Sequence, residues 1–189
     1  MRRRLGLSVL LVAVLVVTGC GSDGEPKADP KPTASPSPTA PPGVDTEPPE
    51  RPATMTNSSA SAQEYARWFA QVVQYALESR DSRVVNAEAF DQGACSGCRS
   101  LATFIAELEQ SGFWQVSDGL DIGPLKASER QDGVRVQGSF TYPRIEDLTV
   151  DGAVSKTIPA KPYGYYVDLS WDEEDESWQV RDFYFQPRA

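Results

Sequence analysis

The chain has 189 residues, with 18 basic and 27 acidic side chains, a net charge of −9 and no histidine. Without an imidazole it cannot build a Ser-His-Asp or Cys-His nucleophile pair, a histidine-based zinc site or a histidine pH switch. The acidic balance also argues against nucleic-acid binding, because phosphate neutralisation needs clustered cations and no such cluster is present. Catalysis, if any, would depend on carboxylates, tyrosine or lysine.

The N-terminus has the organisation of a bacterial lipoprotein signal. Three arginines at 2–4 precede an apolar run over 5–17 that is short for a membrane span. The run ends at 17–20 in the sequence VTGC, which resembles a lipobox, where small residues precede a cysteine that is diacylated after cleavage. We expect a signal peptide over 1–19 and two acyl chains on Cys20 that anchor an exported protein to the outer face of the cell membrane. An uncleaved membrane anchor is the alternative.

Residues 20–57 have the composition of a disordered tether. From 21 to 57 the chain holds ten of its 15 prolines and no aromatic residue, so it cannot bury enough apolar surface to fold. Its serines and threonines either keep the tether soluble or are sites of O-glycosylation. Every Trp, Tyr and Phe lies between Tyr65 and Phe185, which predicts one folded domain over 58–189.

Three helices are predicted at the start of this domain. A capping-box spacing at 61–64 opens the first, and apolar residues at three-to-four spacing give it one wide apolar face over 62–79. A short second helix is expected over 85–89 and a third over 96–111. Four side chains of the third helix are expected to face inward: Leu101, Phe104, Ile105 and Leu108.

Antiparallel sheet is predicted for the rest of the domain. Alternating apolar residues and turn signals predict a hairpin of 120–129 with 134–142, and a second hairpin of 163–171 with 178–185. Between them, 144–161 is a polar insertion expected to form a flap or a small extra hairpin over one end of the sheet. The fold class is therefore α+β.

Three helices followed by long strands resemble the nuclear transport factor 2-like, or SnoaL-like, cone. More closely, the lipobox, the Pro-rich tether, the sequence YARWF at 65–69 with Tyr75-Ala76, and CSGC at 95–98 resemble a family of actinobacterial lipoproteins that form a domain of unknown function. The resemblance covers 55–187, and its most specific mark is the CxxC before the third helix. The chain departs from the family pattern in carrying Trp-Phe rather than two tyrosines in the first helix. The resemblance implies a curved sheet around the helices with a pocket at its open end, and it transfers no catalytic residue.

Cys95 and Cys98 are the cysteines that remain once Cys20 is acylated. We expect them to form a disulfide, because disulfides persist in exported proteins, and to lock the turn that starts the third helix. A redox role would place an activated thiolate at the helix N-terminus, but the βαβ context of thioredoxin is missing.

No metal or cofactor is expected. Two thiolates without histidine cannot close a zinc shell. The run 172–176 places five carboxylates in one turn, which could attract calcium or a basic partner. A solvated turn fits better, because the alternating pattern of a calcium loop is absent.

A candidate catalytic group comes from the last two strands. Strict alternation places Asp182 on one face with Trp178, Val180 and Tyr184, which is a carboxylate among aromatic side chains. Such surroundings raise the pKa of a carboxyl group into a range useful for proton transfer. Asp168 and Tyr166 on the neighbouring strand would complete the group. The alternative is that Asp182 pairs with an arginine or lies at a rim.

Some aromatic side chains of the core are also expected to line a pocket. The set consists of Tyr65, Trp68, Phe69, Tyr163, Tyr165 and Trp171, and all except Tyr163 are our candidate pocket residues. Such a pocket suits apolar or amphipathic ligands.

The leading hypothesis is a lipid-anchored, non-catalytic extracytoplasmic domain that binds a small ligand or a cell-envelope protein. The competing hypothesis is a small-molecule isomerase, dehydratase or hydrolase that uses Asp182 and a tyrosine.

Overall fold

The computed structural model describes residues 40, 41, 44 and 47–188. The predicted signal peptide, Cys20 and most of the predicted tether lie outside the described residues. Among the described residues, no helix is long and apolar enough to cross a membrane.

All three predicted helices are present: α1 (Ser59–Ser79), α2 (Arg83–Asn86) and α3 (Ser96–Ser111). The first begins earlier than the capping-box spacing suggested, because the Ser58 hydroxyl accepts a hydrogen bond from the backbone N–H of Ser61. The second helix is a single turn that ends before the predicted range does. The third has the predicted bounds and stops at Gly112, which adopts a left-handed conformation with φ of 74°.

In the described part of the chain, six antiparallel strands form one sheet: β1 (Trp114–Ser117), β2 (Asp121–Ile122), β3 (Lys126–Arg130), β4 (Gly133–Leu148), β5 (Val154–Asp172) and β6 (Ser177–Pro187). The central order is β1-β4-β5-β6, and β2 and β3 also pair with β4. The predicted strand over 120–129 is therefore broken in two, and β1 was missed.

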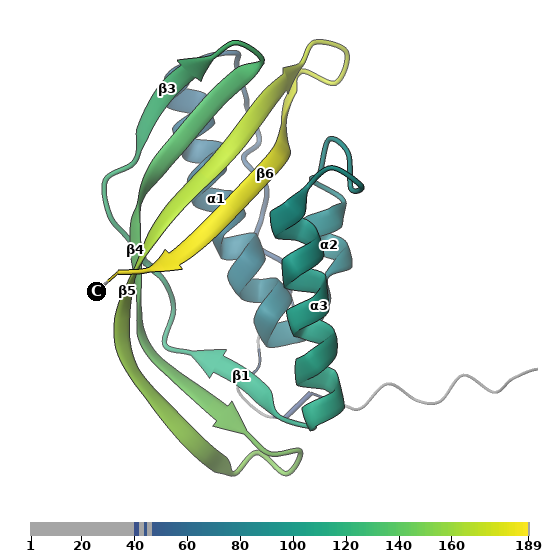
Figure 1. The fold of residues 1–189 in the computed structure, drawn as a ribbon, viewed down its shortest axis with the longest axis vertical. Helices are drawn as coiled ribbons and strands as arrows, with labels where there is room; N and C mark the ends of the chain where they lie inside the picture. The colour runs from purple at the N-terminus through teal and green to yellow at the C-terminus, as the bar shows by residue number, and fades with distance from the viewer. Residues whose placement is uncertain (1–39, 42–43, 45–46, 189) are drawn as a thin grey trace, which may run out of the picture. The chain divides into compact units, whose positions relative to one another are not determined.

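The predicted polar insertion is a continuation of the sheet. Arg144 pairs with Pro159 and Leu148 with Val154, so β4 and β5 extend well beyond the strands expected from alternation. The expected extra hairpin is the far end of these two strands. Figure 1 shows this end beside β1 and the last turn of α3.

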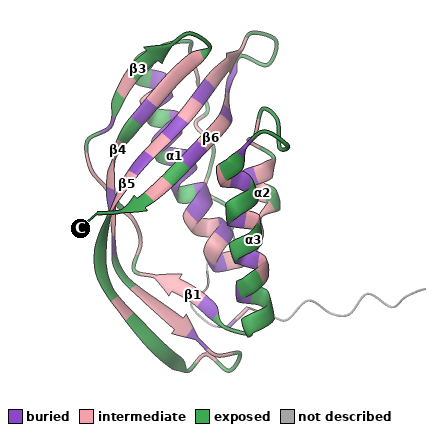
Figure 2. Ribbon diagram, viewed as in Figure 1, coloured by how far each residue is buried: buried purple, intermediate pink, exposed green. Residues whose placement is uncertain are grey.

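The sheet curves around the helices, and the core lies between them (Figure 1). Figure 2 shows buried residues on the helices and along the strands that pack against them. Tyr65 and Phe69 of α1 meet Val136, Val167 and Leu169 of the sheet there, each with 0% exposure. This arrangement is the α+β fold predicted from the sequence, with helices packed on a curved antiparallel sheet.

A β-bulge interrupts the alternation of β6. Val180 pairs with Leu169, whereas Asp182 pairs with Asp168, so Arg181 is an extra residue on β6. Consequently Val180 and Phe183 are both buried, and Asp182 lies on the other face. The predicted face shared by Asp182 and Val180 is wrong for this reason.

The start of α3 is fixed by the predicted disulfide. Cys95 and Cys98 are joined, and both are buried. Cys95 is the N-cap residue, and its Sγ accepts a hydrogen bond from the backbone N–H of Cys98 at 3.1 Å. The disulfide therefore locks the first turn of the helix, as predicted.

The folded body begins before the predicted boundary at 58. The indole Nε1 of Trp68 donates to the carbonyl of Pro49 at 3.1 Å. Arg51 forms an ion pair with Glu88 at 3.0 Å and stacks near the ring of Tyr65. The last part of the predicted tether therefore packs on the domain instead of extending freely from it.

Candidate functional site

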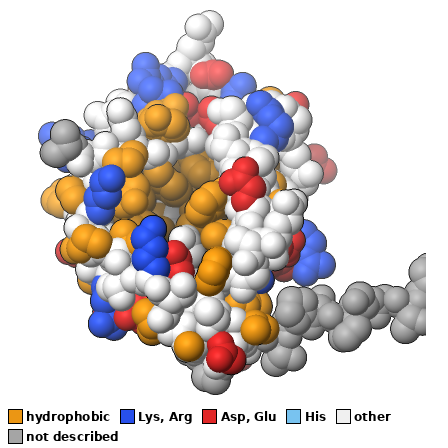
Figure 3. All heavy atoms as spheres, turned by 60° about the horizontal axis from the view of Figure 1, so that its bottom comes forward, with side chains coloured by type: hydrophobic (Ala, Val, Ile, Leu, Met, Phe, Trp, Pro, Cys, Tyr) orange, Lys and Arg blue, Asp and Glu red, His pale blue; other side chains and the backbone are white. Residues whose placement is uncertain are grey.

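An apolar pocket of about 360 Å³ lies between α1, α3 and the sheet. It opens at the end of the molecule that carries β1 and the long hairpin, where Figure 3 shows a hollow whose visible walls are mostly hydrophobic. Its apolar walls are formed by Val73, Leu77, Leu101, Phe104, Val116, Phe140, Tyr142, Ile145, Ile158, Tyr163 and Phe185. A cavity of this kind, apolar with a few polar groups, is the usual form of a small-molecule site.

The aromatic wall of the pocket comes from three neighbouring strands. The ring of Phe140 stacks on Tyr163, with centroids 5.3 Å apart, and meets the ring of Phe185 edge-on at 5.0 Å. Alternation along β4 places Tyr142 on the same face as Phe140. Phe104 on α3 was expected to be an inward-facing core residue, yet 41% of it is exposed, because it lines the mouth of the pocket.

Among the described residues, Glu78 contributes the one carboxylate that lines this pocket. Glu78 lies one helical turn after Gln74 on α1, and only 8% of Glu78 is exposed. Its Oε1 accepts three hydrogen bonds, from the backbone N–H of Ser117 at 3.1 Å, the Ser117 hydroxyl at 2.8 Å and Gln74 Nε2 at 3.0 Å. Gln74 also donates to the Ser117 hydroxyl at 2.9 Å. The carboxylate is thereby held in one position between α1 and β1.

The second carboxylate oxygen of Glu78 has no hydrogen-bond partner among the described residues. No lysine or arginine is among the described residues that line the pocket, and no ion pair to Glu78 is formed among them. The pocket therefore presents a negatively charged acceptor inside apolar walls.

Tyr142 contributes a buried hydroxyl group to the same pocket as Glu78. Burial raises the pKa of Tyr142, and the negative charge of Glu78 and the neighbouring Tyr163 raise it further. The phenol therefore stays protonated and keeps its O–H as a donor. The sequence pattern pointed to neither Glu78 nor Tyr142, because a single polar residue on a helix face reveals no partner on a distant strand.

The five aromatic residues predicted for the pocket do not line this cavity. Tyr65, Phe69 and Tyr165 are buried in the core, with exposures of 0%, 0% and 3%, and Trp68 packs beside them at 8%. Trp171 borders a different depression near the β5–β6 turn. Of the larger aromatic set, only Tyr163, which is not among the five candidates, lines the apolar pocket.

The predicted catalytic residues do come together, but on the outer face of the sheet, opposite Tyr165 and Val167. Asp168 pairs across the strands with Asp182, and both line a polar depression of about 520 Å³. They are absent from the lining of the apolar pocket.

Both carboxylates of this group have structural partners. Arg135 holds Asp168 through two hydrogen bonds of 2.7 and 2.6 Å, and its guanidinium lies 4.3 Å from the ring of Tyr166. Asp182 accepts a hydrogen bond from the backbone N–H of Gly97 at 2.8 Å and from the Ser96 hydroxyl at 3.0 and 2.8 Å. The arrangement holds the start of α3 against β6.

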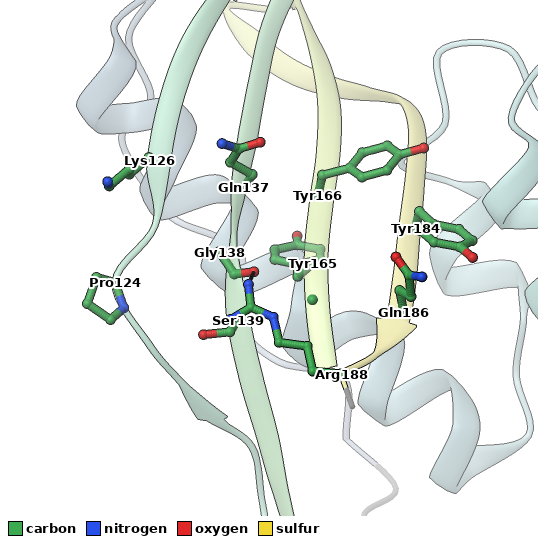
Figure 4. Close-up of a pocket in the computed structure, with 11 residues that line it drawn as sticks. Pro124, Lys126, Gln137, Gly138, Ser139, Tyr165, Tyr166, Tyr184, Gln186 and Arg188 are labelled. Atoms are coloured by element: carbon green, nitrogen blue, oxygen red, sulfur yellow. Dashed lines mark hydrogen bonds between the residues drawn. The ribbon is translucent and has the colours of Figure 1, made fainter. Parts of the chain in front are cut away.

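Tyr166 also borders a second outer depression of about 630 Å³. Figure 4 shows its ring and that of Tyr184 on neighbouring strands, with Gln186 and Arg188 below them and Lys126 on the far side. The lining is polar and carries two cations. It therefore differs in chemistry from the apolar pocket on the other face.

Among the described residues, no three Cys, Asp or Glu side chains lie close enough together to hold a metal ion. In the acidic turn, Asp172 accepts hydrogen bonds from the backbone N–H groups of Glu174 at 2.9 Å and Asp175 at 3.3 Å. Asp172 thus stabilises its own turn.

No protein-family model and no curated protein matches the chain. Solved structures with a similar arrangement include a protein from Catenulispora acidiphila, with 12% identity, a TM-score of 0.46, and 68% of this chain and 92% of that chain covered. Another is Aln2 from a Streptomyces species, with 13% identity, a TM-score of 0.44, and coverages of 71% and 94%. A third is the intermembrane-space region of the chloroplast protein ARC6, with 12% identity, a TM-score of 0.43, and coverages of 69% and 98%. These likenesses concern the fold alone.

Proposed function

We propose that this protein is a lipid-anchored, extracytoplasmic binding protein that takes a small, predominantly apolar ligand into the pocket between α1, α3 and the sheet. The observation that carries the proposal is the pocket itself, a cavity of about 360 Å³ with aromatic and aliphatic walls and an open mouth. Water molecules find few hydrogen-bond partners in such a cavity. An apolar ligand that enters it gains about 25 cal/mol of binding free energy for each Å² of apolar surface removed from water.

Binding is better supported than catalysis by the position of the acidic groups. Asp182 and Asp168, the carboxylates predicted for a catalytic role, line the outer face and are engaged by the start of α3 and by Arg135. A carboxylate needs to reach a substrate within hydrogen-bond distance to act as a general base. We therefore give no catalytic role to this pair.

The binding proposal is tested by filling the pocket. Ile158 lines the pocket on β5, and the neighbouring Thr157 is exposed. We expect Ile158→Trp to weaken binding of a neutral apolar fluorophore, N-phenylnaphthylamine, by about tenfold or more, and Thr157→Trp to leave it unchanged. Fluorescence titration of the full chain measures both. Equal binding by the two variants, or no binding by the wild type, would overturn the proposal.

The membrane anchor is a separate part of the proposal. It rests on the arginines at 2–4, the apolar run and the VTGC sequence ending at Cys20, all outside the described residues. Cys20→Ala should move the protein from the membrane fraction to the soluble fraction, because two acyl chains supply the anchor. Retention at the membrane would contradict the assignment. The relationship to the actinobacterial lipoprotein family belongs to the same proposal. A cell-envelope protein is the alternative to a small ligand as the bound partner.

A further inference from the structure

We propose that the ligand of the apolar pocket carries a cationic, hydrogen-bond-donating head group, such as a protonated amine, that binds the carboxylate of Glu78. The inference rests on the proposed function, because it specifies the chemistry of a ligand for that same pocket. The ligand class is an amphipathic amine, with an apolar body against the aromatic wall and an ammonium group at Glu78.

The first support is the unequal use of the two carboxylate oxygens. Oε1 of Glu78 accepts from Gln74 and twice from Ser117, at distances between 2.8 and 3.1 Å. Oε2 accepts no hydrogen bond from any described residue. An ionised carboxylate offers about four acceptor positions, so Glu78, which lines the pocket at 8% exposure, retains unused acceptor capacity there.

The second support is the charge balance of the cavity. Glu78 is the one ionisable carboxylate among the described lining residues, and none of those residues is basic. Burying a charge is unfavourable unless a partner of opposite charge or several donors compensate for it. Three donors already serve Oε1, and an ammonium group from a ligand would supply the positive charge and a donor to Oε2.

The third support is the fixed position of this acceptor. Three hydrogen bonds tie Glu78 to α1 and β1, so little conformational entropy remains to be lost when a ligand arrives. Tyr142, kept protonated by burial beside Glu78, adds an O–H that can orient a polar head. Both groups lie among apolar walls, where a charge-assisted hydrogen bond is stronger than in water.

The test compares three eight-carbon probes that differ only in the head group: octylamine, octanol and octanoate. At neutral pH octylamine is protonated, octanol is neutral and octanoate is anionic. Isothermal titration of the full chain should show octylamine binding about tenfold or more tightly than octanol, and octanoate binding more weakly than both. The Ile158→Trp variant, titrated in parallel, provides the blank for uptake outside the pocket.

The matched variants are Glu78→Gln and Glu64→Gln, which remove the same charge from the same helix. Glu64 is exposed, whereas Glu78 lines the pocket. The advantage of octylamine over octanol should disappear in Glu78→Gln and persist in Glu64→Gln. Circular dichroism checks that each variant is folded, and the wild-type probe series stands independently if Glu78→Gln does not fold.

Each outcome separates this inference from the binding proposal. If octanol binds and Ile158→Trp abolishes its binding, but octylamine has no advantage, the pocket binds apolar ligands and the cationic inference is overturned. The cationic inference is also overturned if octanoate binds most tightly, or if the octylamine advantage survives in folded Glu78→Gln. If none of the probes binds above the blank, the binding proposal itself fails.

Discussion

Asp182 shows how the expected role of a single residue changes between sequence and structure. Strict alternation along the last strand placed it among apolar side chains, as a potential proton carrier. The bulge at Arg181 turns it outward, and there its carboxylate accepts hydrogen bonds from Ser96 and Gly97 at the first turn of α3. Amide groups in the first turn lack intrahelical acceptors, and the positive end of the helix favours an anion. Asp182 is therefore a cap supplied by a neighbouring strand.

Asp182→Ala should lower the free energy of unfolding by about 1–2 kcal/mol, the usual range for loss of a helix cap together with its charge. Asp182→Asn should cost less, because the amide oxygen still accepts a hydrogen bond. Urea denaturation measures both. Asp175→Ala, on the exposed β5–β6 turn, serves as the control. Unchanged stability in Asp182→Ala, or loss of probe binding at unchanged stability, would contradict this structural role.

At the scale of elements, Gly97 marks a close approach of α3 to β6. A Cβ at this position would lie 2.3 Å from the carbonyl oxygen of Phe183 and 2.9 Å from its ring. Glycine inside a helix is normally unfavourable by about 1 kcal/mol relative to alanine. At Gly97 the contact with the backbone of Phe183 decides whether alanine raises or lowers the stability, because the strand cannot move aside as a flexible side chain would.

Gly97→Ala should therefore destabilise the domain by about 1–3 kcal/mol, the range typical of overpacking, although alanine has a higher helix propensity than glycine. Thermal and urea unfolding provide the measurement. Ser100→Ala, at an exposed position of the same helix, should be neutral or slightly stabilising. An increase in stability for Gly97→Ala would show that α3 and β6 are further apart than the structure has them.

The elements themselves differ in how far the sequence predicts them. α1 and α3 follow from three-to-four spacing because each buries one continuous face, and β5 follows from its alternation at Tyr165, Val167 and Leu169. β1 has four residues and depends on pairing with the distant end of β4, so no local pattern reveals it. The bulge in β6 likewise could not be predicted from the alternation of apolar and polar residues along the strand.

The candidate site was predictable only in outline. The resemblance to a cone implied a pocket at its open end, and the structure has one. Its polar residues were not predictable, because Glu78 meets Ser117 only once β1 is packed against α1. The aromatic residues chosen from periodicity were mostly the core, since the same pattern marks buried residues whether or not a cavity adjoins them.

At the scale of the whole molecule, the segment before α1 belongs to the folded body. Met55 packs against the core, Trp68 donates to the carbonyl of Pro49, and Arg51 pairs with Glu88. We expect a chain beginning at Pro38 to be more stable than one beginning at Ser58 by about 1–2 kcal/mol. This range combines one hydrogen bond with a half-exposed ion pair, each worth about 1 kcal/mol or less.

Urea denaturation of the two truncated chains measures this difference, and Arg51→Ala in the longer chain should account for part of it. Equal stability of the two chains would return the domain boundary to 58, where composition alone placed it. A matched exposed substitution, Arg130→Ala, controls for the loss of one positive charge.

Three buried tyrosines predict how the stability of the whole domain depends on pH. Burial is the main cause that raises the pKa of Tyr65, Tyr142 and Tyr165 above the ordinary value of 10.0, and nearby Glu88 and Glu78 contribute at the first two. In the unfolded chain these phenols lose their protons near pH 10, whereas in the folded domain they keep them. Their contribution is therefore complete below about pH 10 and is lost as the pH rises toward the higher values of the folded state.

Above pH 10 the free energy of unfolding should fall by up to about 4 kcal/mol per pH unit, the slope for three protons at 1.36 kcal/mol each. Urea denaturation between pH 8 and pH 11 measures the slope. Tyr165→Phe should reduce the slope by about a third, besides losing the 2.8 Å hydrogen bond to the Ala66 carbonyl at every pH. Tyr184→Phe, at a side chain 50% exposed, is the matched control for removal of one phenol. An identical slope in Tyr165→Phe would mean that this phenol ionises as readily in the folded domain as in the unfolded chain.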